Sequence, residues 1–286
     1  MRGGTSKALM FHLRDLPDQQ DLWPDLFISA IGAGDPYGRQ LNGMGGGISS
    51  LSKVCVISAS ENSDTDVDYQ FFQLTPRSRI VDSSASCGNM AAAVGPFAVD
   101  EGLVSVNGDH ACIRILNVNT GRIIHSTFSL SEGLAAVSGD LYLPGVAGSG
   151  APINLKFENP GGGATGKLLP TGRPTDELQT PNTNFEVSMV DAGNPCVFVR
   201  AQDLGLAGCE LPDTLSQFSE VLDTLEHIRL RASVAMGIAD NINQASGIPG
   251  IPKIAIVSCP TDYVTLSAET ISKSDCDLVL LSLIHI

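Results

Sequence analysis

The segment of residues 83–99 constrains the fold of this chain more than any other. It begins with small polar residues around Cys87 and continues, over residues 91–99, as Ala-Ala-Ala-Val-Gly-Pro-Phe-Ala-Val, without a charged side chain. Small polar residues followed by an apolar run are typical of the start of a helix, and a helix without a polar face has to be buried. The sequence therefore predicts a buried helix with Cys87 at its N-terminal end.

Further segments predict strands and two more helices, as in a loop-rich α/β protein. Helices are expected over residues 16–31, where Pro17 helps to start the helix, and over residues 214–238, where apolar residues recur with a helical period. Asn119-Thr120-Gly121 predicts a hairpin turn. Strands are expected from the runs of apolar and β-branched residues at 8–13, 54–58, 68–74, 104–118, 123–128, 187–190, 196–199 and 253–258.

The chain length predicts two domains. Its 286 residues exceed the length that a single hydrophobic core usually stabilises, so two domains of about 140 residues each are expected. The Gly- and Pro-rich stretch 144–182 is the longest loop-like segment, and we place the boundary at its end, between domains 1–182 and 183–286. Residues 4–16 and 193–204 share a Gly turn, an apolar strand and an Asp-Leu exit, which indicates that the two halves are structural repeats.

Charge and cysteine content exclude several classes of protein. The net charge of −14 repels phosphate backbones, so we expect no nucleic-acid partner. No segment approaches the roughly 20 apolar residues of a membrane span, and the apolar run 8–13 is too short for a signal peptide. The seven cysteines form no Cys-x-x-Cys pair, which favours reduced thiols in the cytoplasm over disulfides or a metal site.

One Gly-rich segment matches the spacing of a phosphate-binding P-loop. Residues 161–167 read Gly-Gly-Gly-Ala-Thr-Gly-Lys, but Leu168 stands where a Ser or Thr should bind magnesium. The preceding Asn-Pro is not a strand, and Pro170 prevents a following helix. We therefore interpret the segment as a connection and reject the P-loop.

Cys87 is the strongest chemical candidate. Unpaired N–H groups and the dipole at a helix N-terminus stabilise a thiolate, and the N–H groups of Gly88 and Asn89 can hold a substrate carboxylate. The alternative is a structural cysteine packed against the helix. Three neighbouring serines, at positions 83, 84 and 86, favour the functional interpretation.

The other candidate groups are weaker. Lys53 follows a run of Gly and Ser at the start of an apolar strand, and its spacing alone predicts a surface lysine. The histidines at positions 12, 110, 125 and 227 lie in separate segments, and no Asp or Cys near them stands in a triad-like setting.

Six further motifs stand in a definite order along the chain. They are Met-Arg-Gly-Gly-Thr-Ser-Lys at 1–7, Gly-Gly-Gly-Ile-Ser-Ser-Leu-Ser-Lys at 45–53, Ser-Cys-Gly-Asn-Met at 86–90, Gly-Lys-Leu-Leu-Pro-Thr-Gly at 166–172, Val-Asp-Ala-Gly-Asn-Pro at 190–195 and Leu-Glu-His-Ile-Arg at 225–229. In this order they resemble the PrpF family, and the resemblance runs from residue 1 to about residue 279. This family resembles diaminopimelate epimerase in fold, and it includes methylaconitate isomerase and 4-oxalomesaconate tautomerase.

The resemblance implies two similar α/β domains, each a mixed sheet around a central helix, which hold the substrate between them. It implies an isomerase without cofactor or metal that shifts a C=C bond in a small di- or tricarboxylate of the methylaconitate or oxalomesaconate type. The catalytic pair would be Lys53 and Cys87. The substrate-binding positions would be Gly88, Asn89, Arg2, Ser49, Ser50 and Asn194. A homodimer is a possible assembly, and the resemblance does not decide the oligomeric state.

The chain departs from the family at both ends. The strand that normally precedes the first motif is not seen before Arg2, and residues 280–286 do not continue the family pattern, so we expect an incomplete second domain.

Two alternatives remain. An epimerase or racemase of the same fold would need a second Cys followed by Gly-Asn, which the four cysteines after residue 190 lack. An inactive fragment that only binds carboxylates is the other alternative.

Overall fold

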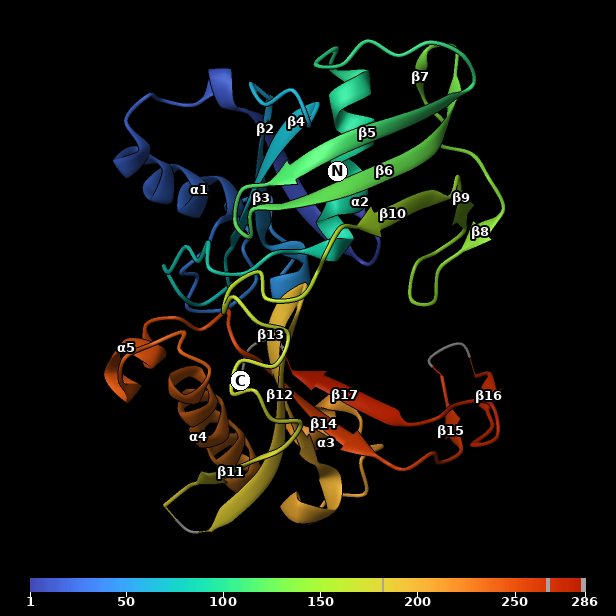
Figure 1. Ribbon diagram of the computed structural model, residues 1–286. Coiled ribbons are helices and arrows are strands. Elements are labelled where there is room, and N and C mark those ends of the chain that lie inside the picture. The colour runs from blue at the N-terminus through green and yellow to red at the C-terminus, as the bar shows by residue number, and fades with distance from the viewer. Residues whose placement is uncertain (182, 266–267, 284–286) are drawn as a thin grey trace. The chain divides into compact units, whose positions relative to one another are not determined.

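The computed structural model describes residues 1–181, 183–265 and 268–283 (Figure 1). Their contacts divide the chain into two compact units, Met1–Asn159 and Pro160–Ile286. Each unit has its own mixed sheet and its own apolar core. The expected α/β class with two separate mixed sheets is therefore confirmed.

The first unit contains an eight-stranded sheet in the order β1-β2-β3-β4-β5-β6-β10, with β7 paired to β6. The pairs β2–β3 and β4–β5 are parallel and the others are antiparallel. The strands are β1 (Arg2–Gly3), β2 (Ser6–His12), β3 (Lys53–Ala59), β4 (Val67–Gln73), β5 (His110–Asn117), β6 (Arg122–Ser131), β7 (Leu134–Ala135) and β10 (Ile153–Phe157), with a separate hairpin of β8 (Leu141–Tyr142) and β9 (Ser149–Gly150).

Helix α2 (Gly88–Asp100) is the centre of this unit. Figure 1 shows it behind the strands β5 and β6, and it contacts every strand of the eight-stranded sheet. Nine of its 13 residues are buried, so the predicted buried helix is confirmed. Gly95 is required by this packing, because a Cβ atom there would lie 2.7 Å from the Ser126 Oγ and 2.8 Å from the Phe128 ring.

Helix α1 (Trp23–Ile31) packs against strands β3 and β4 through an aromatic cluster. The ring centroids of Phe27 and Phe72 are 5.0 Å apart, and Trp23 lies within 6.2 Å of both rings. The helix begins later than the predicted residue 16, after two short 3-10 helices, Leu13–Asp15 and Gln20–Leu22. Pro24 explains the difference, because proline is tolerated in the first turn of a helix but not in its interior.

The second unit has a five-stranded sheet in the order β11-β12-β13-β14-β17. Helix α4 (Ser219–Ala235) lies in the connection between the parallel strands β13 and β14, and it buries one stripe that includes Leu225, Ile228 and Ala232. The expected helix 214–238 is thus divided into α3 (Pro212–Leu215) and α4. The remaining elements are β11 (Asp176–Gln179), β12 (Asn184–Ala192), β13 (Asn194–Arg200), β14 (Lys253–Ser258), β17 (Val279–Leu283), α5 (Ile242–Ser246) and a hairpin of β15 (Tyr263–Val264) and β16 (Thr270–Ile271).

The two units repeat one order of elements, as the sequence echo predicts. In each unit an antiparallel pair joined at a Gly, β1–β2 or β12–β13, is followed by a 3-10 helix and by α1 or α4. The next core strand, β3 or β14, then pairs in parallel with the second strand of that pair.

The boundary between the units lies earlier than the expected position at residue 182, which itself is outside the described residues. Gly161 forms a β-bridge with Ala192, and β11 pairs with β12, so residues 160–179 belong to the second sheet. The stretch 144–182 also contains the strand β10 of the first sheet. Its Gly and Pro content therefore marks turns between short strands rather than one long linker. Another difference concerns Val104 and Val106, which precede β5 in a loop.

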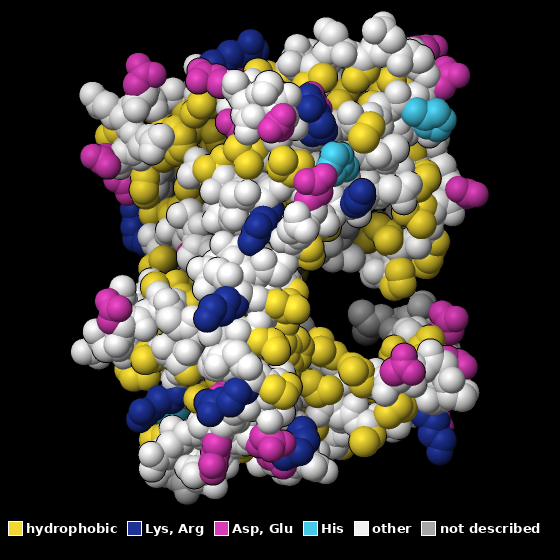
Figure 2. All heavy atoms as spheres, viewed as in Figure 1, with side chains coloured by type: hydrophobic (Ala, Val, Ile, Leu, Met, Phe, Trp, Pro, Cys, Tyr) yellow, Lys and Arg dark blue, Asp and Glu magenta, His cyan; other side chains and the backbone are white. Residues whose placement is uncertain are grey.

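On the face shown in Figure 2, the surface carries Lys and Arg side chains in several places among uncharged and acidic ones. Within the described residues, no helix combines the length and apolar character that crossing a bilayer requires. Of residues 280–286, which we expected to depart from the family pattern, the last three lie outside the described part of the chain.

The packing around α2 yields a stability prediction. Gly95→Val should lower the free energy of unfolding by about 1–3 kcal/mol, because the added methyl groups overpack the contact with β6. Urea denaturation measures the change. The matched control is Ala92→Val, on the same helix at a half-buried position. Equal stability of the two variants would contradict the close contact between α2 and β6.

Candidate active site

Lys53 is the first residue of β3 and is only 4% exposed. The prediction of a surface lysine from spacing alone is therefore wrong. Strand β3 lies inside the sheet between β2 and β4, and Lys53 is the register partner of Ala8 on one side and of Gln73 on the other. A side chain in that position cannot reach the outer surface, so the Lys53 amino group is held at the boundary of the core.

Two contacts define the surroundings of the Lys53 amino group. Its Nζ donates a hydrogen bond of 2.5 Å to Oε1 of Gln73. It also lies 5.3 Å from the centre of the Phe71 ring, a distance at which the ring face attracts a cation. Both partners come from β4, so strand pairing places the ammonium group.

Cys87 is the N-cap residue of α2, as the sequence predicts. It is half-buried with an extended backbone, and its carbonyl oxygen accepts the N–H of Ala91 at 3.0 Å. Its side chain makes no capping hydrogen bond, so the thiol does not satisfy the first N–H groups of the helix.

The segment before Cys87 is fastened by two asparagines of the β5–β6 hairpin. Asn119 donates hydrogen bonds to the carbonyl oxygens of Phe71 and Ser83 and accepts one from the Phe71 N–H. Asn117 donates to the Ser86 Oγ at 2.5 Å. These contacts tie the start of α2 to the same strand, β4, that holds Lys53.

Cys55 and Tyr69 interact with the candidate residues. The Tyr69 hydroxyl donates to the carbonyl oxygen of Cys87 at 3.4 Å. Burial raises the pKa of the Cys55 thiol, and the nearby Cys87 raises it further, whereas the Tyr69 hydrogen bond and Lys53 act in the opposite direction. Lys53 and Cys87 thus both influence the pKa of one buried thiol of the first unit.

The substrate-binding positions predicted near α2 meet at its N-terminus. Gly88 and Asn89 are exposed, and the Asn89 side chain donates to the Thr5 Oγ1 at 3.1 Å. The turn of the β1–β2 hairpin approaches so closely that a Cβ on Gly3 would lie 2.3 Å from the Asn89 carbonyl oxygen. Arg2, on the same hairpin, is exposed and donates to the Gly4 carbonyl.

The two predicted serines lie beside Lys53 in sequence, in the 3-10 helix Ser49–Leu51, and both are half-buried. The Ser49 carbonyl oxygen accepts a hydrogen bond of 2.9 Å from the Gln73 side chain, which links this turn to the lysine. Asn194 belongs to the second unit, where it is half-buried at the start of β13. It is not among the residues that the first unit brings together.

The motif around Asn194 contains a buried carboxylate that sequence reasoning missed. Asp191 is fully buried, and its Oδ2 accepts hydrogen bonds from the Ala164 N–H, the Thr165 N–H and the Thr165 hydroxyl, all between 2.8 and 2.9 Å. The segment 161–167 therefore wraps around a carboxylate of its own unit, and no helix follows it. Both facts agree with the rejection of a P-loop.

Comparison with known proteins decides the family. A sequence profile described as "PrpF protein" matches residues 1–285. The chain belongs to the PrpF family. The 3-methylitaconate isomerase of Eubacterium barkeri is 40% identical over 281 residues, which are 98% of this chain and 73% of the relative. The 2-methyl-aconitate isomerase of Shewanella oneidensis is 37% identical over 295 residues, which cover 99% of this chain and 74% of the relative.

A solved structure agrees with this membership. The crystal structure of a methylitaconate-delta-isomerase superposes with a TM-score of 0.75 at 39% identity, covering 99% of this chain and 73% of that chain. The predicted family and enzyme class are therefore confirmed, and this PrpF protein is an isomerase. The sequence-based prediction of the site did not include four of the residues described above, namely Gln73, Cys55, Tyr69 and Asp191.

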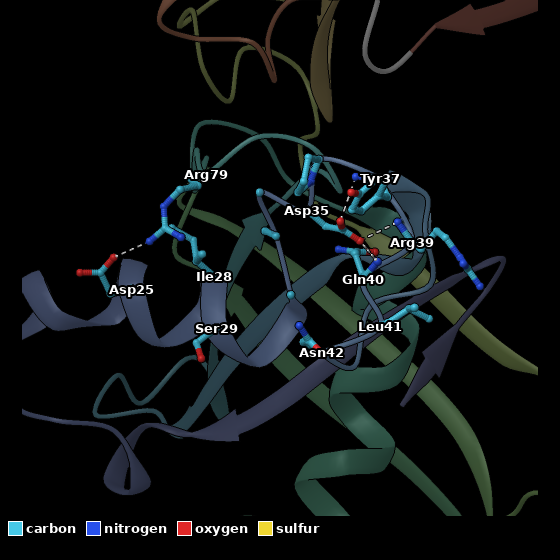
Figure 3. Close-up of a pocket in the computed structure, with 14 residues that line it drawn as sticks. Asp25, Ile28, Ser29, Asp35, Tyr37, Arg39, Gln40, Leu41, Asn42 and Arg79 are labelled. Carbon is cyan, nitrogen blue, oxygen red and sulfur yellow. Dashed lines mark hydrogen bonds and ion pairs between the residues drawn. The ribbon is translucent and has the colours of Figure 1, made fainter.

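A separate pocket of about 720 Å³ lies between α1 and the loop of residues 32–42 (Figure 3). Three of its charged side chains, those of Asp25, Arg79 and Asp35, have partners within the unit. Asp25 lies 3.3 Å from Arg79, and the N–H groups of Tyr37, Gln40 and Arg39 hold the pKa of the Asp35 carboxyl below its ordinary value. These contacts shape the loop that leads to Ser49 and Lys53, and we assign this pocket no part in the chemistry.

The buried thiol and phenol yield a prediction for alkaline pH. Burial raises the pKa values of Cys55 and Tyr69, so both groups ionise more easily in the unfolded chain. Their contribution to stability is complete below the ordinary thiol pKa of 9.0 and is lost as pH rises above it. Cys55→Ala should therefore make the decline in the free energy of unfolding between pH 9 and 10.5 shallower, by up to about 1.4 kcal/mol per pH unit.

Urea denaturation under reducing conditions measures this slope at each pH. Cys112→Ser, which changes an exposed thiol, is the control and should leave the slope unchanged. Parallel curves for Cys55→Ala and the unmodified protein would contradict the burial of the Cys55 thiol.

Proposed function

We propose that this PrpF protein is a cofactor-independent isomerase that shifts a C=C bond in a small di- or tricarboxylate by 1,3-proton transfer. Lys53 and Cys87 are the proposed acid and base. This assignment is supported by the 4% exposure of Lys53, by the half-buried position of Cys87 at a helix N-terminus, and by the influence of both residues on the pKa of the buried Cys55 thiol.

The chemistry matches these groups. A base removes a proton from the sp3 carbon next to the double bond, and the electron pair spreads over the allyl system and its carboxylate as a dienolate. An acid then returns a proton at the other end of the allyl system, so that no net oxidation or reduction occurs. The Lys53 ammonium and the first N–H groups of α2 stabilise the negative charge of the dienolate.

The substrate class follows from charge and from the relatives. In a chain of net charge −14, the exposed Arg2 and the buried Lys53 supply local positive charge on the same unit as the N–H groups of Gly88 and Asn89. The two relatives compared above are named for 3-methylitaconate and 2-methyl-aconitate. We therefore propose a branched unsaturated di- or tricarboxylate, with oxalomesaconate as the keto analogue to be tested beside them.

The proposal also covers the cellular location and the oligomeric state of the protein. A half-buried free thiol at the site requires a reducing compartment, so we place the protein in the cytoplasm. A homodimer is compatible with the site, and light scattering during size-exclusion chromatography decides the assembly state.

The direct test is isomerisation in deuterated solvent. The protein, dialysed against a chelator, is incubated with 3-methylitaconate, 2-methyl-aconitate or oxalomesaconate, and NMR follows both the double bond and deuterium uptake. Isomerisation of at least one acid supports the proposal. Binding without turnover would favour an inactive carboxylate binder, inversion of a stereocentre without movement of the double bond would favour an epimerase, and activity lost on dialysis but restored by a metal ion would overturn cofactor independence.

Replacement of the thiol tests the role of Cys87. Cys87→Ser should lower kcat by on the order of 10²–10⁴-fold, because a hydroxyl is a much weaker base than a thiolate at neutral pH. Steady-state kinetics measure the loss, and circular dichroism checks the fold. Cys112→Ser, at an exposed thiol on β5, should retain full activity. Comparable activity of Cys87→Ser would show that Cys87 is structural.

Replacement of the amino group tests Lys53 separately. Lys53→Met keeps an unbranched side chain of similar size, shorter by the terminal amino group, and so removes the charge and its protons. The rate should fall by on the order of 10²-fold or more, the size of lost acid–base or electrostatic assistance. Lys156→Met, on the edge strand β10, is the matched control for loss of a lysine and should leave kcat unchanged. An active Lys53→Met variant would remove Lys53 from the proposed mechanism.

A further inference from the structure

Gln73 has an unusually complete set of hydrogen bonds. It is the last residue of β4, is 5% exposed and lies opposite Lys53 in the register of the antiparallel pair β3–β4. Its Nε2 donates to three carbonyl oxygens, those of Leu74 at 2.7 Å, Ser49 at 2.9 Å and Ser52 at 3.3 Å. Its Oε1 accepts from the Lys53 Nζ at 2.5 Å.

The three carbonyl oxygens determine which way the Gln73 amide faces. Carbonyl oxygens only accept hydrogen bonds, so the NH₂ group of the amide must point toward them and the oxygen must point away. The amide oxygen therefore faces Lys53, and the reverse orientation would place two donors against the lysine and an acceptor against three acceptors. The turn of Ser49 and Ser52 thereby orients the lysine through Gln73.

A neutral acceptor at this place has a chemical consequence. An amide oxygen accepts a hydrogen bond from either an ammonium or a neutral amine, so it holds the nitrogen in place without requiring a charge. A carboxylate at the same distance would favour the ammonium by Coulomb attraction and would hinder loss of its proton. Gln73 thus permits both protonation states that an acid–base residue passes through.

The Gln73 backbone extends this arrangement to the other candidate residue. Its N–H and carbonyl oxygen form a bridge with Asp82, at 2.8 and 2.9 Å, five residues before Cys87. One residue therefore fastens the segment that leads to the thiol with its backbone and orients the amine with its side chain.

We infer that Gln73 is a positioning residue that orients the Lys53 amine through a neutral acceptor, a contact that both protonation states of the amine can make. This inference rests on the proposed role of Lys53. Among the titratable groups of this region, the Cys55 thiol interacts with Lys53, and Cys87, the Tyr69 phenol and the Met1 amino group interact with Cys55; a change at Gln73 alters none of them chemically.

Gln73→Glu tests the inference through the Lys53 pKa. The chain has six lysines, so NMR of protein labelled at lysine Cε resolves their titrations, and Lys53→Met assigns the signal of Lys53. Gln73→Glu should raise the Lys53 pKa by on the order of one unit or more. Gln70→Glu adds the same charge on the same strand at a half-buried position and should leave it within about 0.3 units. Equal small shifts in both variants would overturn the inference.

A measurement on the unmodified protein covers the case in which Gln73→Glu does not fold. The side-chain amide resonances of Gln73 should shift with the same midpoint pH as Lys53, and this titration should be absent in Lys53→Met. An amide signal that does not follow Lys53 would overturn the inference.

Kinetics then separate this inference from the proposed function. With 3-methylitaconate, the limb of the pH profile of kcat/KM that depends on Lys53 should move to higher pH in Gln73→Glu and stay in place in Gln70→Glu. Full activity of Lys53→Met would refute the proposed role of Lys53, whereas an inactive Lys53→Met with an unmoved pH profile in Gln73→Glu would refute only the role of Gln73.

Discussion

The exclusion of water from helix α2 is the constraint on which the first unit depends. Its uncharged run offers no face that solvent could cover, so every strand of the eight-stranded sheet contacts it. Each 100 Å² of apolar surface removed from water contributes about 2.5 kcal/mol, so the contacts of α2 with every strand of the sheet stabilise this unit. The strands can enclose a helix only by curling, and Gly95 allows the close approach that this requires.

The position of the chemistry follows from this enclosure. The N-terminus of α2 emerges where β3 begins and β4 ends, so groups near Cys87 lie at the border between a dry core and solvent. Lys53, Cys55 and Tyr69 are all buried at that border, where the neutral form of a thiol or phenol is favoured by desolvation. A lysine in the same place needs defined partners, and β4 supplies them as an amide oxygen and an aromatic ring.

Local patterns predicted much of the fold, because its strongest signals lie within short segments. The helix behind Cys87, the hairpin at Asn119 and the strand starting at Lys53 all follow from residues within one window. The start of α1 and the boundary between the units depend instead on Pro24 and on strand pairing across some 30 residues. Such pairing partners leave no signature in a single sequence.

The site shows the same division between local and distant information. Ordered motifs predicted Lys53 and Cys87 as site residues, but the buried Lys53 amine donates its hydrogen bond to Gln73, which is 20 residues away on another strand. Alternation within two strands could have shown part of this, since Lys53 and Cys55 share one face of β3 and pair with Gln73 and Phe71 on β4. That inference needs the register of the two strands, which the sequence alone does not supply.

The buried carboxylate of Asp191 affects where a protease can cleave this chain. A run such as residues 161–167, next to a boundary between two compact units, would ordinarily be the place where a protease divides a chain. Here three hydrogen bonds to one oxygen of Asp191 hold the run against its own unit, and protease cleavage needs a locally unfolded strand. A fragment of the first unit obtained by limited digestion is therefore better sought by cutting elsewhere, because the segment that looks most like a linker is fastened to the second sheet.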